Sequence, residues 1–173
     1  SSGNLVANEI TKTNGTYTKS TGKDSSGNDL ATGYSITNNG TIQVGTFLNL
    51  PASFKIKNNG IIKDKDSSTG GATYTFAGTY DNSSTGTLIV DDGSVTNTAA
   101  EITINNLTLK KSNTINGTQK ITVTNATYTD STNLAIIGTV ELPGVTNGNV
   151  TIGNVHTEGT TTFTSPYQLD TLT

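Results

Sequence analysis

The sequence predicts an all-β sandwich of about ten short strands, and three observations carry this prediction. Apolar and polar residues alternate with a period of two in many short segments, whereas no convincing helical period occurs. Turn signals separate these segments at short intervals. Hydrophobic residues make up 31% of the chain and charged residues 13%, and the polar remainder is rich in Thr, Asn, Ser and Gly. This composition is typical of strands with solvated faces rather than of a disordered chain.

The strands follow from the alternation, and the region 101–110 shows it most clearly. Ile102 and Ile104 alternate in one phase, Leu107 and Leu109 in the other, and the change falls at Asn105-Asn106. We interpret this change as a β-bulge. In chain order the expected strands are 33–37, 41–48, 54–57, 73–80, 86–90, 101–110, 119–129, 134–142, 149–155 and 167–172.

Asn-Gly pairs mark the turns between several of these strands. They occur at 39–40, 59–60, 116–117 and 147–148. Because both residues tolerate positive φ, an Asn-Gly pair between alternating segments favours a type I′ hairpin. The same short strands could instead form a β-helix, but we find no fixed period of about 20–30 residues, so the sandwich is preferred.

Composition excludes several classes of partner and site. The chain has no Cys, Met, Trp or Arg, and its formal net charge is −3. Without Arg there is no bidentate fork for phosphate or guanine, so we expect no nucleic-acid partner. No segment approaches the roughly 20 apolar residues of a membrane span. The first residue is Ser1 rather than Met, and we expect a processed, exported protein that lies outside the cell, at its surface.

Catalytic signals are weak, so we expect a protein that is not an enzyme and has no cofactor. His156 has no partner at the level of the sequence, and no nucleophile elbow, zinc-protease motif or P-loop occurs. The carboxylates of Asp64/Asp66, Asp91/Asp92 and Glu101 could pair as in a glycosidase, but we interpret them as solvated acidic turns.

Calcium is the more plausible ion for the oxygen-rich turns. Residues 64–70 place oxygen side chains at alternate positions, like the start of an EF-type loop. Gly70 comes one place late, and Thr75 stands where that loop needs Glu. Asp91-Asp92-Gly93 forms a second oxygen-rich turn. These departures keep calcium near Asp64/Asp66 or Asp91/Asp92 as an open alternative, and we predict no metal site.

N-glycosylation is the chemistry for which the chain offers the most acceptor residues. The composition alone would produce about as many sequons by chance, so their number carries little weight. Several lie in expected exposed turns, and we expect N-linked glycans on an exported chain. The sequons begin at Asn14, Asn39, Asn82, Asn106, Asn116, Asn125 and Asn149.

The N-terminal segment is apolar and has no obvious partner. Leu5, Val6, Ala7 and Ile10 precede the first turn signal at Asn14-Gly15. One interpretation makes the segment the first strand of the chain's own sheet. The other makes it a donor strand that fills a groove in the next subunit, where main-chain hydrogen bonds give affinity. We prefer the second, with residues 1–12 as a donor tail and residues 13–173 as the sandwich body.

These features together resemble a known type of protein, the donor-strand β-filaments of archaeal surfaces, in particular the glycosylated thread subunits of thermoacidophilic archaea. The shared features are the processed start, the apolar N-terminal segment from Leu5 to Ile10, the Thr- and Asn-rich β body, the lack of Cys and the sequons. The resemblance implies an immunoglobulin-like β-sandwich, a tail inserted into the next subunit and glycans on the fibre. Asn8 and Glu9 interrupt the apolar alternation of the tail, so either terminus could be the donor.

The functional prediction is therefore structural. We expect a subunit of an extracellular filament, assembled from identical copies head-to-tail by donor-strand complementation, that serves adhesion or cell–cell contact. The alternative is a free-standing β-sandwich, either an adhesin or a carbohydrate-binding module, although the lack of Trp weakens sugar stacking.

Overall fold

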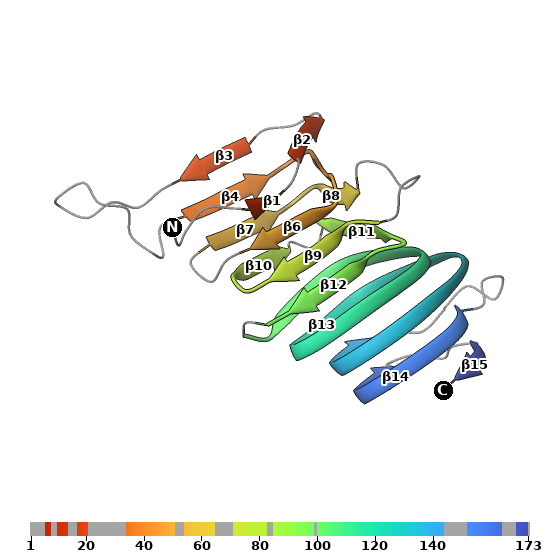
Figure 1. The fold of residues 1–173 in the computed structure, drawn as a ribbon. Coiled ribbons are helices and arrows are strands. Elements are labelled where there is room, and N and C mark those ends of the chain that lie inside the picture. The colour runs from red at the N-terminus through yellow and green to blue at the C-terminus, as the bar shows by residue number, and fades with distance from the viewer. Residues whose placement is uncertain are drawn as a thin grey trace.

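The computed structural model shows a chain made almost entirely of β-strands (Figure 1). It describes residues 6–7, 10–13, 17–20, 34–50, 54–64, 71–82, 85–98, 100–143, 152–163 and 169–172. The strands are β1 (Val6–Ala7), β2 (Ile10–Thr13), β3 (Tyr17–Ser20), β4 (Tyr34–Asn38), β5 (Thr41–Val44), β6 (Phe47–Leu50), β7 (Phe54–Asn58), β8 (Ile61–Asp64), β9 (Thr73–Phe76), β10 (Thr79–Asn82), β11 (Thr87–Asp91), β12 (Ser94–Asn97), β13 (Ile102–Leu142), β14 (Ile152–Phe163) and β15 (Leu169–Leu172).

The strands form a parallel β-solenoid of about four turns. We call one passage of the chain around the axis a rung. Early rungs visit three faces in order: the first face holds β4, β7 and β10, the second holds β5, β8 and β11, and the third holds β6, β9 and β12. Each strand pairs in parallel with the strand one rung later, so the rungs stack along one axis (Figure 1).

The strand β13 continues this stack as one long strand that turns at its corners, with positive φ at Lys111 and Gly138. Its residues 106–110 pair with β11 on the second face, and residues 114–116 pair with β12 on the third. Contacts across about one rung then join β13 to itself: Asn125 Nδ2 lies 3.3 Å from Asn106 Oδ1, and Asn133 Nδ2 lies 3.4 Å from Ser112 Oγ. Residues 134–142 finally pair with residues 155–163 of β14.

The core lies inside the stack and is filled by alternate residues of each strand. On the second face, Ile42 of β5, Ile62 of β8 and Leu88 of β11 are in register and almost fully buried. On the third face, Leu48, Tyr74 and Val95 repeat this arrangement. Burial of these apolar columns is the main stabilising contribution, because one rung cannot bury its own apolar face and needs its neighbours above and below.

The prediction of an immunoglobulin-like sandwich is wrong, although the all-β class is confirmed. Parallel pairing of each rung with the next replaces the antiparallel sheets expected of a sandwich. The β-helix alternative failed at the sequence level because the rungs differ in length. Thr41 faces Ile61, Ile61 faces Thr87, and Thr87 faces Asn106, which are offsets of 20, 26 and 19 residues. Because the offset from Ile61 to Thr87 is longer than the other two, the sequence does not repeat at one fixed spacing.

The Asn-Gly turns at 39–40 and 59–60 are corners of the solenoid and not hairpin turns. Each links a strand of the first face to a strand of the second, and the two corners stack on each other. Asn38 Nδ2 donates to Asn58 Oδ1 at 2.9 Å, and Asn59 Nδ2 donates to Asn39 Oδ1 at 2.7 Å. Buried polar groups need such partners, and the ladder of amides supplies them from one rung to the next.

The interruption at Asn105-Asn106 belongs to the same corner. Residues before it lie beside β10 on the first face, and residues after it pair with β11 on the second. Asn106 Nδ2 donates to the carbonyl of Gly86, which precedes β11. The predicted β-bulge is therefore a change of face, and the alternating residues on either side of it, Ile102, Ile104, Leu107 and Leu109, are all buried.

A stack of glycines forms another corner near the C-terminal end. Gly138 and Gly159 have φ of 76° and 105°. A Cβ atom added to Gly138 would lie 2.3 Å from the carbonyl oxygen of Gly117, and one added to Gly159 would lie 2.6 Å from that of Gly138. Only glycine combines this backbone conformation with so close an approach of the neighbouring rung.

Candidate functional site

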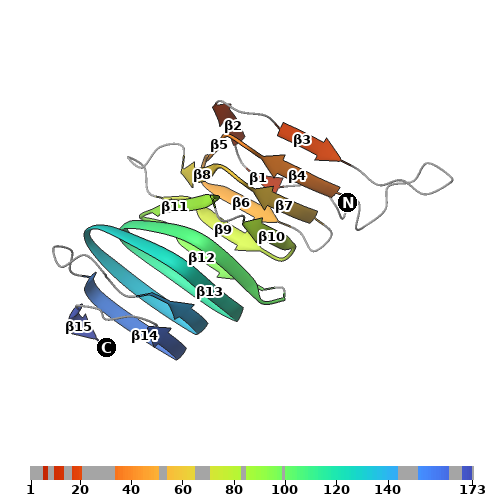
Figure 2. The ribbon, with the colours of Figure 1, turned by 180° about the vertical axis from the view of Figure 1, so that it is seen from behind.

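The two ends of the solenoid differ, and this difference defines the candidate functional site. The N- and C-terminal ends of the chain lie at opposite ends of the stack (Figures 1 and 2). At the first rung, β1, β2 and β3 pair antiparallel with β6, β5 and β4. They reverse the direction of an otherwise parallel stack and cover its edge. At the other end the last described strands are β14 and β15, and β14 is parallel to the rung before it and to β15.

The predicted donor segment pairs with its own chain. Val6 faces Asn49, Ala7 faces Leu48, and Ile10 faces Val44, whereas Leu5 lies outside the described residues. This pairing is the arrangement expected of the first interpretation, a strand of the chain's own sheet. Both β1 and β2 are terminal strands in the order of their sheet, so donation to a neighbouring copy remains a prediction and concerns their outer edges.

The C-terminal end is the feature that sequence reasoning missed. Residues Val155–Phe163 of β14 pair with β13 on one side, whereas β15 on the other side pairs only with Ile152, Asn154 and Val155. From Thr157 to Thr162, the described part of the chain supplies no strand on the outer side of β14. The sequence around Thr161, Thr162 and Phe163 does not show that this strand has an unpaired outer side. An edge strand and an inner strand can share the same alternation of polar and apolar residues.

The predicted glycosylation residues divide into exposed and half-buried positions. Asn39 and Asn125 are exposed, at a corner and on β13 respectively. Asn106 and Asn116 are half-buried, and the amide of Asn106 already donates to Gly86 at 2.8 Å. The side chains of Asn14, Asn82 and Asn149 lie outside the described residues. Among the described sequons, Asn39 and Asn125 therefore offer the most accessible acceptor nitrogens.

Asp64, which the sequence left open as a calcium ligand, points into the solenoid and not to solvent. Tyr74 Oη donates to its Oδ1 at 2.6 Å, and the backbone N–H of Asp91 donates to its Oδ2 at 2.9 Å. Burial raises the pKa of the Asp64 carboxyl group, although these hydrogen bonds oppose that rise. A carboxylate engaged in this way ties β8, β9 and β11 together, and its predicted companion Asp66 lies outside the described residues.

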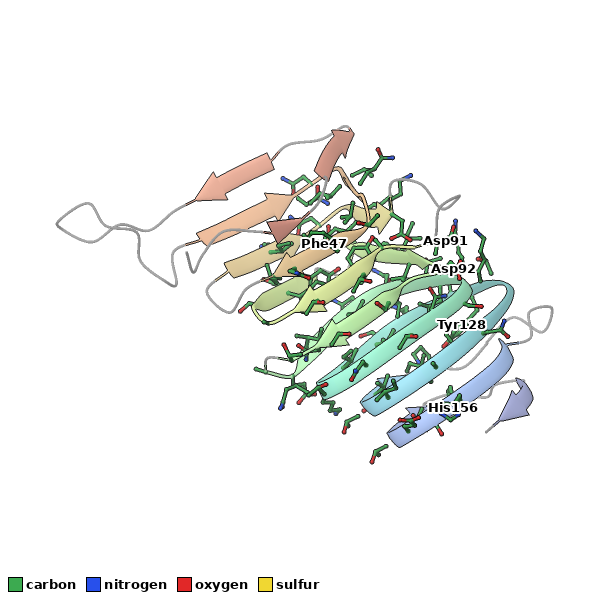
Figure 3. The ribbon with its side chains drawn as sticks, in the orientation of Figure 1. Phe47, Asp91, Asp92, Tyr128 and His156 are labelled. Atoms are coloured by element: carbon green, nitrogen blue, oxygen red, sulfur yellow. The ribbon has the colours of Figure 1, made fainter. Side chains whose placement is uncertain are left out.

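The second turn left open for calcium, Asp91-Asp92, forms an ion pair with Lys111 at a corner. Asp91 and Asp92 lie next to each other at the end of β11 (Figure 3). Asp91 Oδ1 is buried and lies 3.3 Å from Lys111 Nζ, an ion-pair distance without the geometry of a hydrogen bond. Asp92 has φ of 58° and is exposed. Within the described ranges, no three His, Asp or Glu side chains gather closely enough to hold a metal ion.

The remaining carboxylates and the histidine lie on the surface. Lys120 Nζ lies 3.3 Å from Glu101 and 3.4 Å from Glu141, which gives a column of alternating charges across neighbouring rungs. His156 on β14 is exposed, 3.0 Å from Glu158 (Figure 3). It borders a hollow of about 300 Å³ that is open to solvent and lined by Ser112, Asn113, Thr114, Asn133, Leu134, Ala135 and His156.

Comparisons with known proteins give no family. No family model, no curated protein and no solved structure matches the chain. The resemblance to archaeal thread subunits thus remains a prediction from the sequence. Among the described residues, no helix has the length and the apolar character needed to cross a membrane.

Proposed function

We propose that the chain is a structural subunit of an extracellular filament that serves adhesion or cell–cell contact, with identical copies joined head-to-tail. The observation that carries this proposal is that the described part of the solenoid has two different ends, where β1 and residues 157–162 of β14 each have an outer edge without a described partner strand. Such edges present unpaired main-chain groups and favour addition of another strand. Contact between two different surfaces of one chain does not close by itself, and repetition gives a filament.

The side surface fits an exposed, long-lived fibre. Outward positions on the third face are occupied mainly by hydroxyl and amide side chains, which titrate little with pH. In register they are Thr73, Ser94 and Thr114 in one column, and Asn49, Thr75, Thr96 and Asn116 in the other. We propose that glycans at Asn39 and Asn125 add to this polar coat.

The proposal is tested by following self-association of the purified chain with concentration. We expect sedimentation velocity to show species that grow with concentration, and electron microscopy to show unbranched fibres one solenoid wide. Deletion of residues 1–12 should abolish the fibres. A chain that stays monomeric at millimolar concentration would contradict the proposal, and an intact mass of 17.9 kDa from native material would contradict glycosylation.

The alternative function, a free-standing module that binds carbohydrate, is favoured by one observation. The two polar columns of the third face form a regular array, with successive rungs about 4.8 Å apart and side chains along a strand about 7 Å apart. Hydroxyl groups at such spacings suit a hydroxylated polymer. Binding of the monomer to insoluble polysaccharide, lost in a Thr75→Lys, Thr96→Lys double variant, would support this alternative.

A further inference from the structure

We propose that the outer edge of β14 around Glu158, before the corner at Gly159, is the acceptor for strand β1 of the next copy, and that β1 pairs there antiparallel while it keeps its pairing with its own β6. The inference rests on the proposed filament and names its junction. In this arrangement β1 lies between β14 of one copy and β6 of the next, so the sheet of the third face continues from copy to copy.

The first reason is that this edge needs a partner. An extended strand with one open edge is a site for pairing with another chain, and proteins usually cover, charge or interrupt it. Here the one charge between Thr157 and Thr162 is Glu158, whose carboxylate is exposed and lies 3.0 Å from His156, and the stretch contains no proline. On its inner side this stretch pairs in full register with β13. On either side of the corner at Gly159, its main chain is therefore held in the extended conformation that another strand requires.

The second reason is that β1 and the part of this edge before the Gly159 corner lie on the same face of the solenoid. Asn49, which faces Val6 of β1, is in register with Thr75, Thr96 and Asn116 of the following rungs. Gly138 lies directly against Gly117, which brings Ile137 over Asn116, and Ile137 faces Glu158 of β14. Glu158 is thus the position in the last rung that corresponds to Asn49 in the first. Stacking two copies along one axis brings β1 to the edge of β14.

The third reason is that the last rung leaves inward groups uncovered. Thr157 and Thr161 stand over Ile136 and Val140 of the rung before, and both are half-exposed where those residues are buried. The hydroxyl of Thr161 is itself buried and has no hydrogen-bond partner. Phe163 packs against the core and is only partly buried. A second copy stacked on this rung would cover these groups: its β1 would lie near Thr157, and the rest of its first rung would lie over Thr161 and Phe163, which follow the corner.

The junction can be tested by cysteine cross-linking, because the natural chain contains no Cys. In a Val6→Cys, Glu158→Cys double variant, mild oxidation should give a ladder of covalent multimers that reducing agent dissolves. Opposed residues of an antiparallel pair have the Cβ separation that a disulfide requires. Mixing the two single variants should give a cross-linked dimer and nothing larger. A Val6→Cys, Thr160→Cys variant tests the register displaced by two residues.

Matched controls separate this junction from random contact. Glu101 and Glu158 have similar side-chain exposure, 58% and 65%, but Glu101 lies in the middle of the stack, so Val6→Cys, Glu101→Cys should give no ladder. Val6→Cys, Asn49→Cys should give a disulfide within one chain, as expected if β1 keeps its own partner; links only between chains would overturn the shared strand. Fibres without cross-links at 158 or 160 would overturn the junction and leave the filament standing. Absence of any self-association would overturn both.

Discussion

The first three rungs and the rungs that follow are both made of stacked parallel strands, but they differ in the length of these strands and in the regularity of the rungs. Between Tyr34 and Asn97 the strands have four or five residues and the offset from one rung to the next varies between 20 and 26. From Ile102 onward a single strand of 41 residues passes around the axis, and β14 lies 21 residues beyond it, with Leu134 facing Val155. Both parts stack backbone on backbone at glycines, as at Gly60 over Gly40 and at Gly138 over Gly117, but the stacked glycines with positive φ, Gly138 and Gly159, lie in the second part.

This comparison indicates what each part can tolerate. Where rung length varies, side chains must fill spaces of unequal size, as Phe76 and Tyr80 do with ring centroids 4.7 Å apart. Glycines let backbone lie directly on backbone in both parts, but only at Gly138 and Gly159, among the described glycines, is the stacked residue also at positive φ. We therefore expect side-chain truncation to cost most in the first part, and a Cβ atom added to a stacked glycine to cost most at these positive-φ positions of the second.

The largest expected effect is that of Phe76→Ala in the first part. Phe76 is fully buried and stacks on Tyr80, and truncation of such a residue lowers the free energy of unfolding by about 3–5 kcal/mol. Urea unfolding measures the loss. Phe47→Ala is the control, since Phe47 is only half-buried at the start of β6. Equal losses for the two variants would contradict the burial of Phe76.

Gly138→Ala should have the next largest effect, and it acts on the second part. The added Cβ would meet the carbonyl of Gly117 at 2.3 Å, at a φ of 76°. Strain of this kind costs about 1–3 kcal/mol. The neighbouring exposed Thr139 provides a control, because Thr139→Ala should change the free energy of unfolding by less than about 0.5 kcal/mol. If both variants unfold at the same urea concentration, the glycine corner is not stacked.

Asn58→Ala tests the amide ladder of the first part. Its Oδ1 accepts from Asn38, and its Nδ2 donates to the carbonyl of Thr87 at 3.2 Å, so one side chain joins three rungs. Leaving these buried groups without a partner should cost about 1–3 kcal/mol. The adjacent Asn59→Ala removes the exposed contact to Asn39 and should cost clearly less. A smaller loss in the free energy of unfolding for Asn58→Ala than for Asn59→Ala would contradict the buried ladder of amides through Asn38 and Asn58.

The smallest expected effect concerns pH and Asp64. Since burial raises the pKa of Asp64 above its usual 3.8, the folded state binds the proton more tightly than the unfolded state. The contribution of this group to stability is therefore fully present below pH 3.8 and is lost as pH rises through the raised pKa. Asp64→Asn should remove this fall in stability. The comparison of urea midpoints at acid and neutral pH for both chains measures it, and an unchanged pH profile would contradict the assignment.

Parts of the fold could be predicted from the sequence because alternation records burial. The buried residues Ile102, Ile104, Leu107 and Leu109 follow from it directly. Alternation does not record whether neighbouring strands run parallel or antiparallel, and the Asn-Gly signal has the same appearance at a hairpin and at a solenoid corner. The period was present in two places, the Asn-Asn-Gly triplets at 38–40 and 58–60 and the Gly-Thr pairs at 117, 138 and 159, but the longer rung between Ile61 and Thr87 separates them.

The candidate site was harder to predict than the fold. The apolar run from Val6 to Ile10 marked the N-terminal strands, whereas nothing in residues 157–162 marks an open edge. Whether a strand has a neighbour depends on where the chain goes next, and this is a property of the whole stack. Asp64 shows the same limit: its sequence context resembles a calcium turn, but its carboxylate accepts from Tyr74 inside the core.

The central claim is that a parallel solenoid joins end to end through continued strand pairing. Electron cryomicroscopy of the assembled chain, at a resolution that separates strands, tests it most directly. We predict strands perpendicular to the fibre axis at about 4.8 Å spacing, with β14 of one copy beside β1 of the next and no gap in the third face. Fibres in which the copies meet through side chains alone, or in which the strands run along the axis, would contradict it.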